Sequence, residues 1–142
     1  MDSSTGDVDD TYKAISRSMY DVHLTRWLQY FSIKQFHFLS AENLVANPAE
    51  ELHNVEKFLG LRHKLPKDLF YFNETRGFYC MCMDQRKREA NPDKEVAGKC
   101  LSSSKGRTHP SIDPSVLKKL RDFFRPHNER LYKMTGIDFD WK

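Results

Sequence analysis

The sequence predicts an α/β fold whose central sheet is incomplete. Apolar side chains recur at helical spacing between residues 10 and 31, residues 35–40 alternate and then run apolar, and two cap-then-proline pairs mark later helix starts. Of the 142 residues, 39% are hydrophobic, which is enough for a core within one domain or part of one. A parallel sheet needs neighbours on both sides of a central strand, and only residues 35–40 read as such a strand. We therefore expect part of the sheet to be missing from this chain.

The first helix is predicted to begin at Asp9 or Asp10, because a carboxylate is a good N-cap, and to run to about Phe31. Its expected buried stripe is Tyr20, Leu24, Trp27, Leu28 and Phe31. Residues 35–40 are then expected to form a buried strand.

A second helix is predicted from Asn47 and Pro48 to Gly60, with Asn at the N-cap, Pro at the first helical position and Gly as the stop. Its expected buried stripe is Leu52, Val55 and Leu59, and its expected solvated face carries Glu50, Glu51 and Glu56. None of these three carboxylates is expected to act as a catalytic base.

The last helix is predicted to start at Asp113 and Pro114 by the same logic and to end at Gly136. Pro126 lies inside it and predicts a kink or a new helix start, because Pro has no N–H for the helical hydrogen bond. The side chains expected inside are Leu117, Leu120, Phe124, Leu131, Tyr132 and Met134, with Trp141 packing the C-terminus down.

Two short aromatic runs, residues 69–72 and 77–80, read either as strands or as extended loop. Between them, Asn73 and Thr75 form an N-glycosylation sequon. Residues 84–99 are charged, lack hydrophobic periodicity and are expected to form an exposed loop insertion.

Charge and hydropathy limit the possible partners. The formal net charge is only +3, too small for a nucleic-acid coat, so a polyanion would have to bind at local patches. No apolar run approaches the roughly 20 residues that span a bilayer. The polar residues 1–5 do not resemble a signal peptide.

The three cysteines, Cys80, Cys82 and Cys100, leave three readings open. A disulfide between Cys80 and Cys100 is favoured if the fold matures in an oxidising compartment, where it would contribute roughly 3 kcal/mol. A zinc site would need His109 as its fourth ligand, and C-x-C is a poor zinc spacing. Three reduced thiols are the third reading.

The segment from Ser102 to Pro110 has the composition of an anion-binding loop, with hydroxyl and basic side chains around Gly106 and no acidic residue. Hydroxyl and backbone N–H groups donate to phosphate or sulfate oxygens, and Arg107 can grip two oxygens at once. Gly106 lets the backbone approach the anion closely. The alternative reading is a solvated surface turn.

Five blocks, in this order and spacing, resemble the C-terminal half of the heparan sulfate glucosamine 3-O-sulfotransferases. They are residues 20–28 (YDVHLTRWL), 56–61 (EKFLGL), 70–78 (FYFNETRGF), 105–110 (KGRTHP) and 131–136 (LYKMTG). The resemblance implies that residues 1–142 are the C-terminal part of a single sulfotransferase domain. That domain is P-loop-like, with a central parallel sheet flanked by helices.

The resemblance also implies an activity: transfer of a sulfuryl group from 3′-phosphoadenosine 5′-phosphosulfate to the 3-hydroxyl of glucosamine in heparan sulfate. It implies no metal and no nucleic-acid partner. The family's donor-contacting residues correspond to Tyr79, beside the nucleotide, and to the loop residues Ser104, Lys105, Gly106, Arg107 and Thr108. A cysteine pair of the family corresponds to Cys80 and Cys100 and implies the disulfide.

The family pair that touches the saccharide corresponds to Tyr12 and Lys13, where the residue types differ but Lys13 suits a sulfate. The family's 5′-phosphosulfate loop, Lys-Gly-Gly-Thr-Arg, does not occur in the sequence, and no Glu can be assigned as catalytic base. The alternative is therefore a truncated, non-catalytic homologue that binds a nucleotide or a sulfated glycan. Family members are Golgi membrane proteins with a lumenal domain, and we expect an anchor upstream of Met1 in the complete gene product.

Overall fold

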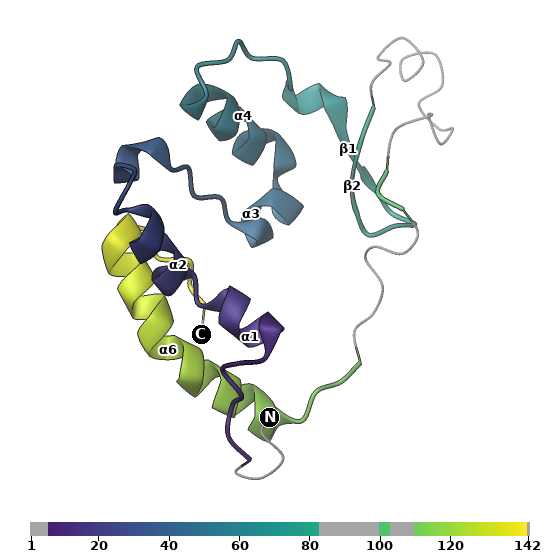
Figure 1. The fold of residues 1–142 in the computed structure, drawn as a ribbon. Helices are drawn as coiled ribbons and strands as arrows, with labels where there is room; N and C mark the ends of the chain where they lie inside the picture. The colour runs from purple at the N-terminus through teal and green to yellow at the C-terminus, as the bar shows by residue number, and fades with distance from the viewer. Residues whose placement is uncertain (1–5, 83–99, 103–109, 142) are drawn as a thin grey trace. The chain divides into compact units, whose positions relative to one another are not determined.

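The elements of the chain belong to two units, each with its own packing. The computed structural model describes residues 6–82, 100–102 and 110–141 (Figure 1). The first unit combines residues 6–36 with 110–141, and the second consists of residues 37–82 and 100–102. Helices occur in both, and the second adds a two-stranded antiparallel sheet, which agrees with an incomplete α/β fold. Parallel strands do not occur among these described residues.

Two short helices replace the single long helix predicted up to Phe31. α1 spans Lys13–Ser18 and α2 spans Tyr20–Trp27, because Met19 between them has ψ 71° and leaves the helical region. The predicted N-cap is also wrong. Asp9 instead closes a turn, since its Oδ1 accepts hydrogen bonds from the N–H and the hydroxyl of Thr11 at 3.0 and 2.6 Å.

α2 packs against α6, which spans Pro114–Thr135 (Figure 1). Leu24 of α2 and Leu131 of α6 are both buried in the first unit. The predicted stripe is wrong for its aromatic members, because Tyr20, Trp27 and Phe31 all stay exposed by 42% or more. The helix ends at Trp27, so Phe31 no longer follows the helical stripe.

α6 begins and ends where the sequence predicts. The Asp113 carboxylate caps it by accepting from the Ser115 N–H at 2.7 Å, and Gly136 ends it at φ 72°. A new helix start at Pro126 does not occur, because the exposed ring costs α6 a single hydrogen-bond donor. Nowhere in the described ranges is there a helix both long and apolar enough to cross a membrane.

The C-terminus packs back onto the first unit, as predicted for Trp141. Its ring is stacked on Phe139 with centroids 4.8 Å apart and also lies against Tyr20 and Tyr132, at 5.9 and 6.1 Å. The backbone N–H of Trp141 donates to the Tyr132 hydroxyl at 3.1 Å.

In the second unit, α3 spans Ala41–Ala46 and α4 spans Pro48–Phe58, with Pro48 at the predicted first position. α4 ends in a Schellman motif: the Leu61 N–H donates to the Glu56 C=O at 2.9 Å and the Gly60 N–H to the Lys57 C=O at 3.1 Å. Gly60 has φ 65°, which suits only Gly well. Leu59 is exposed, contrary to prediction, because it follows the last helical residue.

The strand predicted at residues 35–40 does not form. A 3-10 turn over Ile33–Gln35, capped by Ser32, occupies its start. The following residues are outside any ladder, although Phe36 itself is extended. A strand is held by hydrogen bonds to a neighbour, and the described residues place no strand beside this segment. At its end, the Ser40 hydroxyl caps α3 by accepting from the Asn43 N–H at 3.1 Å.

The two aromatic runs form a β-hairpin, which settles the choice between strand and loop. The 3-10 turn Lys67–Leu69 leads into β1 (Phe70–Asn73), which pairs antiparallel with β2 (Phe78–Met81) (Figure 1). At the connection, the N–H groups of Arg76 and Gly77 donate to the Asn73 C=O at 3.1 and 2.8 Å. Gly77 takes φ 70° there.

Candidate functional site

The hairpin presents an aromatic pair on its exposed face. Phe72 and Tyr79 lie opposite one another in the register, and their rings meet edge to face with centroids 5.4 Å apart. Both are exposed, Tyr79 by 38%. Alternation along the strands turns Tyr71 and Cys80 to the other face, where Cys80 is buried. Tyr79 therefore offers an accessible ring on a paired strand, a placement in which a nucleotide base can stack on it.

Cys80 forms a disulfide with Cys100, the pairing that the resemblance implied. The Cα atoms are 4.6 Å apart, and the Tyr71 hydroxyl donates to the Cys100 sulfur at 3.8 Å. The bond rules out the reading with three reduced thiols and a zinc site that uses these two sulfurs. Cys82 is buried at the end of the hairpin, where its N–H donates to the Leu69 C=O at 2.7 Å.

The predicted donor loop, Ser104, Lys105, Gly106, Arg107 and Thr108, lies outside the described residues, as does the predicted loop insertion at 84–99. What the structure does place is Cys100, which precedes the predicted donor loop. Cys100 is fixed to β2 by the disulfide, four residues before Ser104.

Asn73, the predicted glycosylation site, is buried in the hairpin connection. Its Oδ1 accepts from the Arg76 N–H at 3.0 Å, so the side chain also holds the turn. A glycan would attach at Nδ2, which leaves Oδ1 for that hydrogen bond. The hydrogen bond that holds the turn therefore does not use the atom that would carry a glycan.

Tyr12 and Lys13, the predicted saccharide contacts, lie at the N-terminus of α1 in the first unit. Both are exposed, and Tyr12 occupies the N-cap position without a side-chain cap. They are accessible to a sulfated chain.

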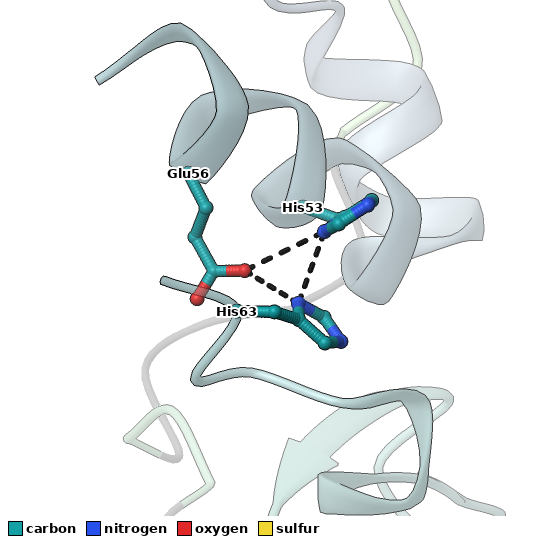
Figure 2. Close-up of side chains that lie close together, drawn as sticks. All are labelled: His53, Glu56 and His63. Atoms are coloured by element: carbon teal, nitrogen blue, oxygen red, sulfur yellow. Dashed lines mark hydrogen bonds and ion pairs between the residues drawn. The ribbon is translucent and has the colours of Figure 1, made fainter. Parts of the chain in front are cut away.

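A cluster that sequence reasoning missed joins α4 to the segment after it (Figure 2). His53 and Glu56 lie one helical turn apart, and His63 follows the Schellman turn. Glu56 is only 5% exposed, so its predicted place on the solvated face is wrong. The hydrogen bond from the Lys64 N–H lowers the pKa of Glu56 most, and His63 lowers it further. Burial has the opposite effect, but the pKa stays below its usual value. The sequence signal that could have revealed this cluster is the His-x-x-Glu spacing of His53 and Glu56 on one predicted helix.

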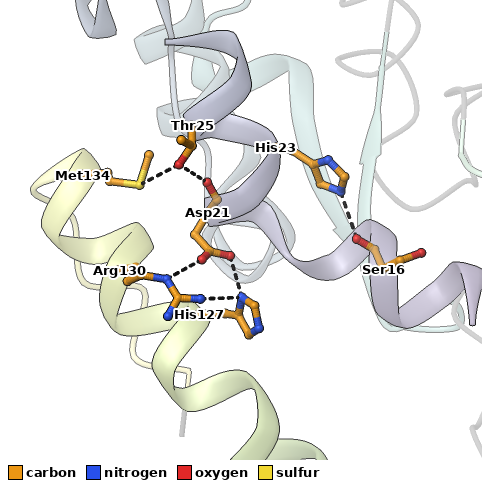
Figure 3. A network of polar contacts seen from close by, with 7 residues as sticks. All are labelled: Ser16, Asp21, His23, Thr25, His127, Arg130 and Met134. Carbon is orange, nitrogen blue, oxygen red and sulfur yellow. Dashed lines mark hydrogen bonds and ion pairs between the residues drawn. The ribbon is translucent and has the colours of Figure 1, made fainter. Parts of the chain in front are cut away.

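A second missed network connects α2 and α6 in the first unit (Figure 3). Asp21, only 3% exposed, accepts from His127 Nδ1 at 2.8 Å and from Arg130 Nε at 2.7 Å. Nearby, the Thr25 hydroxyl donates to the Asp21 C=O at 2.7 Å and lies 3.9 Å from the Met134 sulfur. Burial alone would raise the pKa of Asp21, but the hydrogen bonds from His127 and Arg130 outweigh it and lower the pKa.

The fold and these sites belong to a sulfotransferase domain. Residues 6–137 match the sulfotransferase domain family, so the chain is a member of that family. It is 44% identical over 141 residues to heparan sulfate glucosamine 3-O-sulfotransferase 5 of Homo sapiens, covering 99% of this chain and 38% of that protein. The human 3-O-sulfotransferase 3A1 is 43% identical over 138 residues, covering 97% of this chain and 32% of the relative.

A third relative, human heparan sulfate glucosamine 3-O-sulfotransferase 6, is 40% identical over 136 residues, covering 96% of this chain and 37% of the relative. These matches confirm the resemblance carried by the five sequence blocks. The chain spans 32–38% of the length of these curated relatives.

Proposed function

We propose that the chain is the C-terminal part of a single sulfotransferase domain that sulfates the 3-hydroxyl of glucosamine in heparan sulfate. The observation that carries this is the 44% identity to a 3-O-sulfotransferase over 99% of the chain. The family match runs from residue 6 to 137 and so includes both structural units, which supports one domain with a P-loop-like fold.

The donor, 3′-phosphoadenosine 5′-phosphosulfate, is assigned to the region of the hairpin and the loop after Cys100. Lys105 lies five residues beyond Cys100, so a chain of about 3.5 Å per residue reaches at most roughly 18 Å from the disulfide. Lys105 and Arg107 would pair with donor phosphates, and Gly106 would allow their close approach. Ser104 and Thr108 would add hydroxyl donors.

On the hairpin itself, Tyr79 would stack on the adenine, because its ring lies on the exposed face. The disulfide acts here as an anchor. It joins the strand that carries Tyr79 to the residue from which the basic loop departs.

The acceptor is assigned to the exposed N-terminus of α1, where Lys13 would meet a sulfate of heparan and Tyr12 would lie against a sugar ring. Transfer also needs a base that removes the proton of the acceptor hydroxyl. Glu56 is unsuited to that role, because it is buried and already accepts from His63 and two backbone N–H groups. The base is expected N-terminal to the matched segment.

The Golgi lumen is the proposed location. Disulfides such as the one between Cys80 and Cys100, which are 20 residues apart, form in oxidising compartments. The N-glycosylation sequon at Asn73 also agrees with passage through the secretory pathway. The membrane contact would be an anchor outside this chain.

Calorimetric titration of the chain with 3′-phosphoadenosine 5′-phosphate tests the donor site. The double variant Lys105→Ala/Arg107→Ala is expected to bind at least about 100-fold more weakly, because two charge-assisted contacts are lost. The control Arg121→Ala/Lys133→Ala removes the same charges from exposed positions of α6 and should bind normally. Binding that the double variant leaves unchanged would contradict the donor site, whereas a folded chain that binds no nucleotide would favour the alternative of a non-catalytic homologue that binds sulfated glycans.

A further inference from the structure

The cluster of His53, Glu56 and His63 brings three ligand atoms to one point (Figure 2). His63 Nδ1 lies 2.7 Å from Glu56 Oε2 and 3.0 Å from His53 Nδ1, and the third side, His53 Nδ1 to Glu56 Oε2, is 3.6 Å. A tetrahedral zinc ion with bonds of about 2.0–2.1 Å holds its ligand atoms roughly 3.3 Å apart. The triangle therefore has the size of one face of a zinc site.

Hydrogen bonds engage the three ligand atoms unequally. The Glu56 carboxylate only accepts, so the one proton of His63 Nδ1 is committed to it. If His53 Nδ1 is unprotonated, its lone pair then lacks a proton from His63. If it is protonated, it pairs with Glu56 Oε2 at 3.6 Å, but its N–H group then also faces that of His63 at 3.0 Å. A cation above this face, in place of the His63 Nδ1 proton, would accept a lone pair from all three atoms at once.

The ligand atoms are held in place by the surrounding backbone. Glu56 Oε1 accepts from the N–H groups of Lys64 and Leu65 at 2.7 and 3.1 Å, which directs Oε2 toward the histidines. α4 fixes His53 and Glu56 at i and i+3, the spacing by which helices present Glu and His to metals. The Schellman turn at Gly60 then brings the chain back, so that His63 faces Glu56.

We propose that these three residues bind a divalent zinc ion through His53 Nδ1, His63 Nδ1 and Glu56 Oε2. Imidazole nitrogen and carboxylate oxygen are established zinc ligands, and two His with one Glu make a three-ligand set. The side chains of His53 and His63 are 37% and 47% exposed, so solvent reaches the cluster and can supply water as the fourth ligand. The ion would hold α4 against the segment that leads into β1. This site is independent of the sulfotransferase activity.

The test is calorimetric titration of the metal-free 142-residue chain with zinc chloride, combined with thermal unfolding at increasing zinc concentration. One equivalent is expected to bind, and the melting temperature should rise with zinc, because the ion binds only the folded cluster. Cobalt chloride should give the visible absorption of four-coordinate cobalt.

Three single variants locate the site: His53→Gln, His63→Gln and Glu56→Gln. Each is expected to weaken zinc affinity at least about 10-fold and to abolish the cobalt spectrum. Glu56→Gln keeps an oxygen for the Lys64 and Leu65 N–H groups, so it separates metal binding from folding. His23→Gln, a control in the first unit, should bind zinc normally. Absence of binding, or binding that all three variants leave unchanged, would overturn the proposal.

Discussion

Asp21 Oδ2 accepts a hydrogen bond from Arg130 Nε at 2.7 Å, between residues 109 positions apart in the sequence. His127, one helical turn before Arg130, donates to the other carboxylate oxygen. Figure 3 shows both side chains reaching from α6 to α2. A part-buried polar contact thus joins α2 to α6, and each of the two helices also contributes one buried leucine, Leu24 or Leu131.

Asp21→Asn is expected to lower the free energy of unfolding of the first unit by about 2 kcal/mol, because the charge-assisted hydrogen bonds of a buried carboxylate are weakened. Half of the Arg130 side chain is exposed and can turn to water, which limits the loss. Urea denaturation followed by circular dichroism measures the change. Asp122→Asn, which removes an exposed pairing with Lys118 and Arg125, should have a much smaller effect. Equal effects of the two variants would contradict a special role for Asp21.

The contribution of Asp21 should depend on pH. Its pKa is lower in the folded chain than in the unfolded one, so its stabilisation is complete above the unfolded value of roughly 4 and is lost as pH falls through the folded value. The stability difference between the native chain and Asp21→Asn should therefore shrink between pH 5 and about pH 2. Denaturation at a series of pH values measures it. A difference that stays constant over this range would show that the charge of Asp21 does not matter.

The Cys80–Cys100 disulfide should stabilise the second unit by roughly 3 kcal/mol, because it removes loop entropy from the unfolded chain. Melting temperatures with and without reductant test this. The native chain and Cys82→Ala should both lose stability on reduction, whereas Cys80→Ser/Cys100→Ser should not respond. A reductant effect in the double variant would point to another cause.

Asn73 is expected to carry a glycan when the chain is expressed through the secretory pathway, and to hold the hairpin turn through Oδ1. Thr75→Ala should abolish the glycan and leave the turn intact. Asn73→Ala should abolish the glycan and also lower stability by about 1 kcal/mol. Intact-mass spectrometry and thermal unfolding separate the two effects. If both variants are equally stable, the turn does not depend on Asn73.

Local signals in the sequence predicted the helix boundaries that depend on few residues. Pro48 with Gly60, and Asp113-Pro114 with Gly136, mark α4 and α6 because start and stop residues act within one turn of the chain, although the Asn47 side chain makes no cap hydrogen bond. The predicted strand at 35–40 failed because a strand also needs a neighbour, which no local pattern specifies.

The missed sites have the same origin. The helical pattern placed Glu56 on the solvated face of α4, because its partner His63 lies beyond the end of that helix. The backbone N–H group of Lys64, which donates to the Glu56 carboxylate, also follows the turn at the helix end. Asp21 gave no signal at all, since His127 and Arg130 are more than 100 positions away. In contrast, the Cys80–Cys100 pairing was predictable from the resemblance, which carries tertiary information that composition lacks.

The most direct test of the proposed function is sulfate transfer by a chimera. This chain would replace its 141-residue match in human heparan sulfate glucosamine 3-O-sulfotransferase 5, and product disaccharides would be mapped after reaction with labelled donor. We expect 3-O-sulfated glucosamine, with kcat/KM at least about 100-fold lower in Lys105→Ala/Arg107→Ala and unchanged in Arg121→Ala/Lys133→Ala. A folded chimera that transfers no sulfate to the 3-hydroxyl would contradict the account and identify the chain as a non-catalytic homologue.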